Sequence, residues 1–244
     1  MTNDPYAEHP GLRGKIIDPL SSYFRVNDLR EVMLANPETA PFWHLLHTPE
    51  ERRASRNATL AGHEGDLWVF AYGSLMWNPA LRFDKVLRAH APGHARAFIL
   101  RDIYGGRGTQ DAPGLMAALD VGQGCDGLVF RVPEAIIAEE TDVLWAREFV
   151  GPGYVPQLIE TETTWGTIPA LTFLADHSSV IMAPDVTRAE QIRYVATGEG
   201  FMGSSLDYLR GIKEQFDVLG IVDPNVDDLL SEALQYCEER VSAG

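Results

Sequence analysis

The stretch VFAYGSLMW, Val69 to Trp77, begins as a buried β-strand, breaks at Gly73-Ser74, and then returns to apolar residues. Glycine has no Cβ, so the backbone can turn tightly and approach another group closely at that position. Successive backbone N–H groups in such a turn can point at one anion. The stretch therefore predicts a buried strand that ends in a tight polar turn.

Further strand patterns follow this one along the chain. Short segments rich in branched and aromatic residues are separated by Gly, Pro and Asp between about residues 66 and 174. Few helix patterns interrupt them, which favours an α+β fold with a small, mainly antiparallel, barrel-like core and peripheral helices. The six predicted strands are LWVFAY, RAFILR, LMAAL, GLVFRV, PQLIET and PALTFL.

Helix signals lie on both sides of the strand region. Thr48 and Glu51 form a capping-box pattern around Pro49, and Gly62 follows as a stop. Three more helices are predicted after residue 185. The first opens with Thr187 and Glu190, and the second runs from Ser204 or Ser205 to Gly220. The last has Leu230, Leu234, Cys237 and Val241 on one stripe. We expect an N-terminal helical appendage over residues 1–63 and a main domain over 64–244.

One helix is predicted inside the strand region, in PEAIIAEETDVLWAREF before Gly151-Pro152-Gly153. At 100° per residue, Glu148 lies on the same face as Thr141 and Leu144, which should pack on the sheet. Such a carboxylate can form a salt bridge, for example with Arg96 or Arg101, or can reach solvent. Alternatively, desolvation raises its pKa and makes it a general base. The pattern leaves these interpretations open.

Composition excludes several classes of protein. The 244 residues carry a net charge of −15, which disfavours nucleic-acid partners because phosphates require clustered Lys and Arg. No apolar run is long enough for a membrane span, and the N-terminus lacks the features of a signal peptide. The two cysteines, Cys125 and Cys237, fit neither a disulfide framework nor a zinc site. We therefore expect a cytoplasmic protein with reduced thiols and a small-molecule partner.

Other candidate sites are weaker. Ser74 lacks the flanking glycines of a nucleophile elbow, and GGRG at residues 105–108 matches no dinucleotide or phosphate loop. His44 and His47 have helical spacing but no further ligands, and His90 and His94 are separated by Ala-Pro-Gly. We expect no metal site.

Four blocks of the sequence together carry a family resemblance. These are WVFAYGSLMWNPAL, ARAFILRDIYGGRGTQDAPGLMAALD, LWAREFVGPGY and GSSLDYL. In order and spacing they resemble the ChaC family of glutathione-specific γ-glutamylcyclotransferases, from about Asp66 to the C-terminus. The pairing of the Y-G-S-L turn with a downstream R-E before G-x-Y is the specific part of the resemblance.

The resemblance implies an enzyme that cleaves glutathione to 5-oxoproline and cysteinylglycine without a metal or organic cofactor. It implies that Glu148 is the catalytic acid–base. The turn would hold the γ-glutamyl end of the substrate, supported by the preceding strand and by residues downstream. The implied binding residues are Val69, Phe70, Ala71, Tyr72, Gly73, Ser74, Leu75, Arg107, Tyr154 and Tyr208.

Three positions depart from the family pattern. Ala71 stands in place of a usual Gly, Leu115 in place of a common Arg after Pro-Gly, and Ser205 in place of a frequent Asn. An arginine at position 115 could pair with a substrate carboxylate, so Leu115 removes a contact that would favour binding of the glycyl end of glutathione. Two alternatives therefore accompany the main prediction. One is a cyclotransferase for another γ-glutamyl peptide or amine, and the other is a non-catalytic binding module on the same fold.

Overall fold

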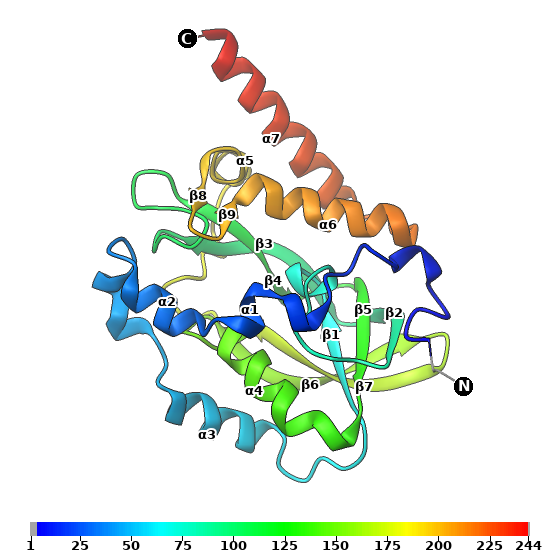
Figure 1. Ribbon diagram of the computed structural model, residues 1–244. Coiled ribbons are helices and arrows are strands. Elements are labelled where there is room, and N and C mark those ends of the chain that lie inside the picture. Colours follow the sequence, from blue (N-terminus) through cyan, green and yellow to red (C-terminus); the bar gives the residue numbers. More distant parts are fainter. Residues whose placement is uncertain (1–3, 244) are drawn as a thin grey trace.

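The computed structural model describes residues 4–243, so residues 1–3 and 244 of the two predicted units lie outside the described residues. Seven strands form one sheet in the order β1-β5-β2-β6-β7-β4-β3, and β7 also pairs with β1. The first five strands of that order therefore close into a barrel, with β4 and β3 extending from β7 (Figure 1). The strands are β1 (Leu67–Ala71), β2 (Lys85–Ala91), β3 (His94–Asp102), β4 (Gly114–Val121), β5 (Cys125–Val132), β6 (Tyr154–Thr163) and β7 (Gly166–Ala175).

The α+β, mainly antiparallel barrel predicted from the sequence is confirmed. Five strand pairings are antiparallel, and the two parallel ones, β1–β7 and β4–β7, are each defined by a single residue pair. All six predicted strands correspond to observed ones, although LWVFAY runs one residue, Tyr72, past the end of β1, and the sequence did not predict β2. Lys85, Arg88 and His90 interrupt its apolar pattern, and pairing with β5 and β6 on its two sides holds it in the sheet. The short strands β8 (Glu199–Gly200) and β9 (Gly203–Ser204) form a separate pair.

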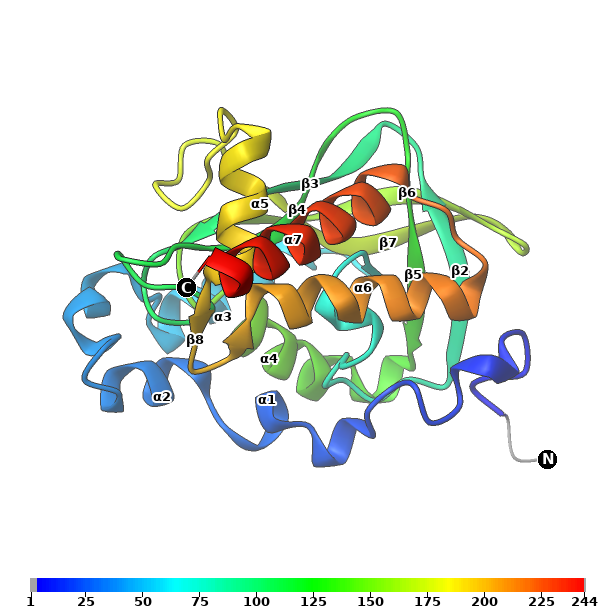
Figure 2. The same cartoon turned by 90° about the horizontal axis from the view of Figure 1, so that it is seen from above.

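Helices cover the barrel on two sides (Figure 1). On one side, α5 (Arg188–Thr197) and α6 (Ser205–Leu219) pack on β4, and α7 (Pro224–Ala243) packs on α5 and α6. Seen from above, α6 and α7 run together across the sheet (Figure 2). On the other side lie α3 (Pro49–Thr59) and α4 (Ile137–Glu148), with the 3₁₀ turn Glu134–Ile136 ahead of α4. No helix of the described chain is both long and apolar enough to span a bilayer.

The predicted helix caps are confirmed. Thr48 and Thr187 each form a complete capping box, and the Ser204 side chain caps α6. Gly220 ends α6 with a φ of 62°, a left-handed conformation that glycine adopts without a steric penalty.

The predicted apolar stripe on α7 is wrong in part. Val226, Leu229 and Ala233 are the fully buried positions, whereas Val241 is 83% exposed. The C-terminal part of the helix projects away from the body of the protein (Figure 1), so its apolar residues have little to pack against.

The N-terminal segment lies directly against the domain. Ahead of α3 it contains two short α-helices, α1 (Tyr23–Val26) and α2 (Leu29–Ala35), and 3₁₀ turns at Pro10–Leu12, Pro19–Ser21 and Ala40–Leu45. Leu12 and Ile16 belong to the main hydrophobic core. Folding of residues 1–63 and 64–244 as separate units stays a prediction.

Candidate active site

The Y-G-S-L turn begins where β1 ends. Residues Ser74–Met76 form a single 3₁₀ turn, and the Gly73 carbonyl accepts the Met76 amide at 2.9 Å. The first amides of a helical turn have no partner within it. Within residues 4–243, the amides of Gly73, Ser74 and Leu75 donate to no protein acceptor. All three residues line a cavity of about 30 Å³ between the turn and β7, so the turn presents unpaired donors beside it.

Glu148 is the last residue of α4 and lines the same cavity. Its side chain is 17% exposed, and burial raises the pKa of Glu148, although the neighbouring Arg147 guanidinium partly offsets this effect. Of the interpretations left open by the sequence, the salt bridge and the raised pKa both hold, because an ion pair with Arg147 and desolvation act on the same carboxylate. A carboxyl group whose pKa is raised in this way is a weaker acid and a better proton acceptor, which suits it to general acid–base chemistry.

The ion-pair partner of Glu148 differs from the two arginines considered in the sequence. Arg147 Nε lies 2.7 Å from Glu148 Oε1, whereas Arg96 pairs with Asp223 at 2.7 Å. Arg96 also donates to the Tyr72 carbonyl, which fixes the end of β1. Within the described chain, Arg101 forms no ion pair.

Arg147 connects the turn to the carboxylate. Its guanidinium is buried, donates to Ser74 Oγ at 2.8 Å and to the Asn78 carbonyl, and lies 4.3 Å from the centre of the Phe24 ring. Burial lowers the pKa of Arg147, but an arginine remains charged in proteins. The R-E pair was part of the family resemblance, yet only Glu148 was assigned a role. The sequence shows that Arg147 and Glu148 are adjacent, but only the structure shows that their side chains form an ion pair in one buried site.

Three tyrosines complete the cavity. Tyr72 donates its hydroxyl to the Phe173 carbonyl at 3.0 Å, and Tyr208 accepts the Ala117 amide at 3.3 Å. Burial raises the pKa of Tyr208 to about 12 and the pKa values of Tyr72 and Tyr154 well above their usual range. These hydroxyls therefore stay neutral and can donate or accept hydrogen bonds.

The Tyr208 hydroxyl lies so close to the backbone of Gly73 that a larger side chain at position 73 would clash with it. A Cβ at position 73 would lie 2.7 Å from Tyr208 Oη but 3.7 Å from Cζ, which is an ordinary contact. We expect Gly73→Ala to destabilise the protein by about 1–3 kcal/mol through overpacking. In a Tyr208→Phe background, the same substitution should destabilise the protein by less than about half of that amount, since the clashing hydroxyl is absent. Urea unfolding of the four proteins measures this, and equal costs in both backgrounds would contradict it.

Not every predicted binding residue reaches the cavity. Val69, Phe70 and Ala71 are fully buried in β1 and support the turn from behind. Arg107 lies 5.3 Å from the centre of the Tyr208 ring and donates to the Ser204 carbonyl, so it acts on the site through Tyr208.

Leu115 and Ser205, two of the three positions that depart from the family pattern, hold backbone segments together in this structure. Leu115 is completely buried, and its amide donates to Ser205 Oγ at 3.0 Å. Ser205 Oγ in turn donates to the Arg107 carbonyl at 3.2 Å. Neither residue lines the cavity or the adjoining pocket, and the effect of Leu115 on binding of the glycyl end of glutathione stays a prediction.

A larger, outer pocket of about 200 Å³ adjoins the cavity, and the two share Ser74, Glu148, Tyr154 and Tyr208. Its lining is mostly apolar and includes residues of the N-terminal segment, which the sequence did not link to the site. In the described part of the chain there is no cluster of three or more His, Cys, Asp or Glu side chains that could hold a metal ion.

The barrel, the turn and the buried carboxylate together are suited to an enzyme that acts on a small molecule. The family described as ChaC-like protein matches residues 67–240. The chain is 37% identical over 204 residues to the glutathione-specific gamma-glutamylcyclotransferase of Escherichia coli strain K12, covering 82% of this chain and 87% of the relative. It is 28% identical to the glutathione-specific gamma-glutamylcyclotransferase of Schizosaccharomyces pombe, covering 60% of this chain and 80% of the relative.

A solved structure shares the fold. The yeast gamma-glutamyl cyclotransferase specific to glutathione superposes with a TM-score of 0.65 at 19% identity, covering 71% of this chain and 97% of that one. The protein belongs to the ChaC-like family.

Proposed function

We propose that this protein is a γ-glutamylcyclotransferase that cleaves glutathione to 5-oxoproline and cysteinylglycine. The observation that carries the proposal is Glu148, a carboxylate of raised pKa that faces unpaired backbone donors across one cavity. The names of the Escherichia coli and Schizosaccharomyces pombe relatives support the same substrate.

The turn would hold the α-carboxylate of the γ-glutamyl group. The amides of Gly73, Ser74 and Leu75 supply donors at the cavity, and the buried charge of Arg147 adds a positive potential next to Ser74. This local arrangement matters because the protein as a whole carries a net charge of −15, which repels anions at longer range.

Glu148 would carry the protons of the reaction. The substrate's α-amine is protonated at neutral pH, and Glu148 accepts one of its protons so that the nitrogen lone pair can attack the γ-carbonyl carbon. A new C–N bond closes the five-membered ring, and the bond to the cysteinyl nitrogen breaks as that nitrogen receives the proton held by Glu148. The ring nitrogen then loses its second proton to become the amide N–H of 5-oxoproline, and the released amine of cysteinylglycine takes up a proton in turn, so no net proton is gained or lost. General acid–base catalysis of this kind contributes roughly 10²–10⁴ in rate.

No separate nucleophile is required. Amine and carbonyl belong to the same molecule, so the site needs only to hold the glutamyl chain folded with the reacting atoms in contact. The proposed reaction uses neither metal nor organic cofactor. The partner is a small molecule, with no role for nucleic acid or membrane, and the cytoplasmic location expected from the sequence stays a prediction.

The test is incubation of the purified protein with glutathione, γ-Glu-Ala and γ-Glu-Lys, with 5-oxoproline quantified. We expect 5-oxoproline chiefly from glutathione. Product mainly from the other two compounds would favour the alternative γ-glutamyl substrate, and no product from any of them would favour a non-catalytic binding module.

A further inference from the structure

Part of the wall of the outer pocket comes from the N-terminal segment. In Figure 1, α1 crosses in front of the barrel between α4 and α6, and α2 continues beyond it to the left. Residues 22–46, which include both helices, precede the region matched by the family, which begins at residue 67. Six apolar side chains of this segment line the pocket: Phe24, Leu29, Met33, Phe42, Leu45 and Leu46. We call residues 22–46 the N-terminal wall.

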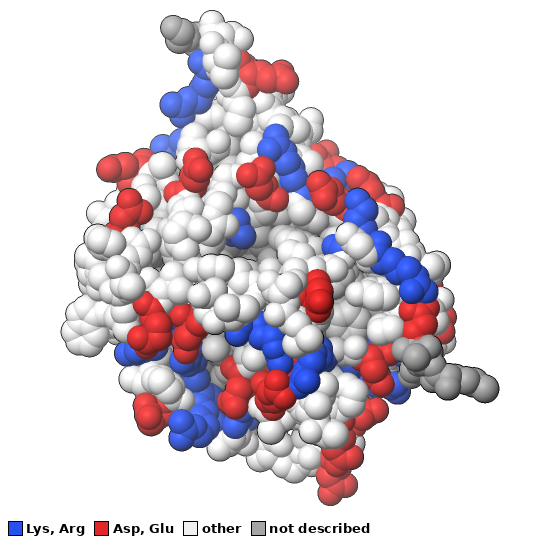
Figure 3. Space-filling view, in the orientation of Figure 1, with Lys and Arg blue, Asp and Glu red and all other residues white. Residues whose placement is uncertain are grey.

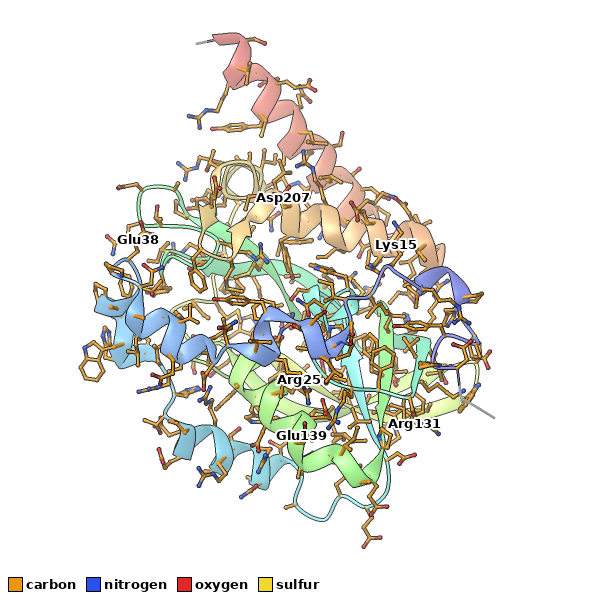
Figure 4. All side chains as sticks on the ribbon, in the orientation of Figure 1. Lys15, Arg25, Glu38, Arg131, Glu139 and Asp207 are labelled. Carbon is orange, nitrogen blue, oxygen red and sulfur yellow. The ribbon has the colours of Figure 1, made fainter. Side chains whose placement is uncertain are left out.

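The first end of the N-terminal wall is fixed to α4. Arg25 pairs with the fully buried carboxylate of Glu140 at 2.6 Å and with Glu139 at 2.7 Å. Arg25 and Glu139 lie together between α1 and α4 in Figure 4. The ring of Phe24 stacks on the Arg147 guanidinium, the group that contacts Glu148 and Ser74. This end of the wall therefore touches the catalytic machinery directly.

The second end is fixed to the loop after β3 and to the end of α4. The rings of Phe42 and Tyr104 meet edge to face, with their centres 4.9 Å apart. The Gly105 backbone, with a φ of 98°, comes so close to Thr39 that a Cβ there would lie 2.7 Å from the Thr39 methyl carbon. The ring of His47, just beyond the wall, stacks on Phe149 at 4.2 Å. Because both of its ends pack against the domain, the N-terminal wall is a fixed part of the pocket.

Much of the remaining lining of the outer pocket is also apolar, and charged groups are confined to Arg101, Asp102, Arg147 and Glu148. The apolar part includes Leu100, Met116, Ile181 and Met202, and methionine side chains adapt readily to ligands of different shape. On the face shown in Figure 3, charged side chains gather above and below a largely uncharged central band. The Cys-Gly leaving group of glutathione is short and polar, so it leaves most of this apolar lining without a partner.

We propose that the N-terminal wall makes the outer pocket a subsite for a bulky apolar group on the leaving side of the substrate. The preferred substrates are then γ-glutamyl compounds such as glutathione alkylated on sulfur, whose alkyl chain extends from the reacting centre at Glu148 along the wall. The inference rests on the proposed function and specifies its substrate class.

The experiment compares S-hexylglutathione with unsubstituted glutathione, using 5-oxoproline release by the full-length protein. Burial of the hexyl chain should lower KM at least about tenfold relative to glutathione. Phe42→Ala and Met33→Ala remove wall side chains from two different elements, and each should raise KM for S-hexylglutathione at least about fivefold, with a change of less than about twofold for glutathione. The matched control is Trp43→Ala, a neighbouring aromatic that is 63% exposed, which should change neither value.

Three results would overturn the inference, and they are distinguishable. If glutathione is turned over while S-hexylglutathione is neither cleaved nor inhibitory, the subsite is absent although the proposed function stands. If Phe42→Ala and Met33→Ala, confirmed as folded by circular dichroism, impair both substrates equally, the wall supports the fold without selecting the substrate. If neither compound yields 5-oxoproline, the proposed function fails and the inference fails with it.

Discussion

Glu148→Gln should lower kcat at least about 10²-fold, because the amide can neither accept the proton of the substrate amine nor return it to the leaving nitrogen. Glutamine keeps the size of the side chain and can still contact Arg147, so the fold and the KM should change little. Stopped assays of 5-oxoproline, with circular dichroism to confirm the fold, measure this. The prediction concerns the only carboxylate that lines the cavity in the described chain.

Glu139→Gln is the matched control on the same helix. Its side chain is 60% exposed and pairs with Arg25 and Arg82 at the surface, so this variant should keep nearly full activity. Near-normal turnover in Glu148→Gln would end the proposed role of Glu148. A comparable loss in Glu139→Gln would show that charge on α4, and not proton transfer at its end, explains the effect.

Arg147→Met should lower kcat/KM at least about 10²-fold, since it removes the group that orients both Ser74 and Glu148. It should also change the pH dependence. Burial raises the pKa of Glu148 and Arg147 offsets part of that rise, so loss of the guanidinium raises the pKa further. The acidic limb of the kcat/KM profile should therefore move to higher pH.

The stability of Arg147→Met should follow the same titration. A carboxyl group whose pKa is higher in the folded state than in the unfolded state destabilises the fold above its folded pKa, and this cost fades as the pH falls below it. The variant should thus lose most stability at pH values above the folded-state pKa of Glu148, as urea unfolding across pH would show. Arg147→Lys keeps the charge but not the forked geometry, so it should retain the pH profile and still lose activity. An unshifted acidic limb in Arg147→Met would contradict the positioning role.

Local features of the fold could be predicted from the sequence. Caps such as Thr48 with Glu51 depend on residues three positions apart, and the Y-G-S-L turn depends on one interruption at the end of an apolar strand. The face of α4 that carries Thr141 and Leu144 followed from helical periodicity alone. Each of these features can be recognised from residues that lie close together in the sequence.

Features that depend on distant packing could not be predicted. β2 has a mixed sequence and is held by partners on both sides, and Leu115 is enclosed by packing that its position after Pro-Gly does not reveal. The wall residue Phe24 lies over Arg147 although more than a hundred positions separate them in the sequence. The sequence suggested Glu148 as a candidate, but its pairing with Arg147 and the outer pocket required the three-dimensional structure.

The central claim is that the substrate's own amine, and not water, attacks the γ-carbonyl. The most direct measurement is mass spectrometry of the products formed from glutathione in water enriched in oxygen-18. Internal attack predicts 5-oxoproline without the heavy isotope, released in equal amount with cysteinylglycine. Glutamate carrying oxygen-18 as the main product would show hydrolysis and would contradict the account.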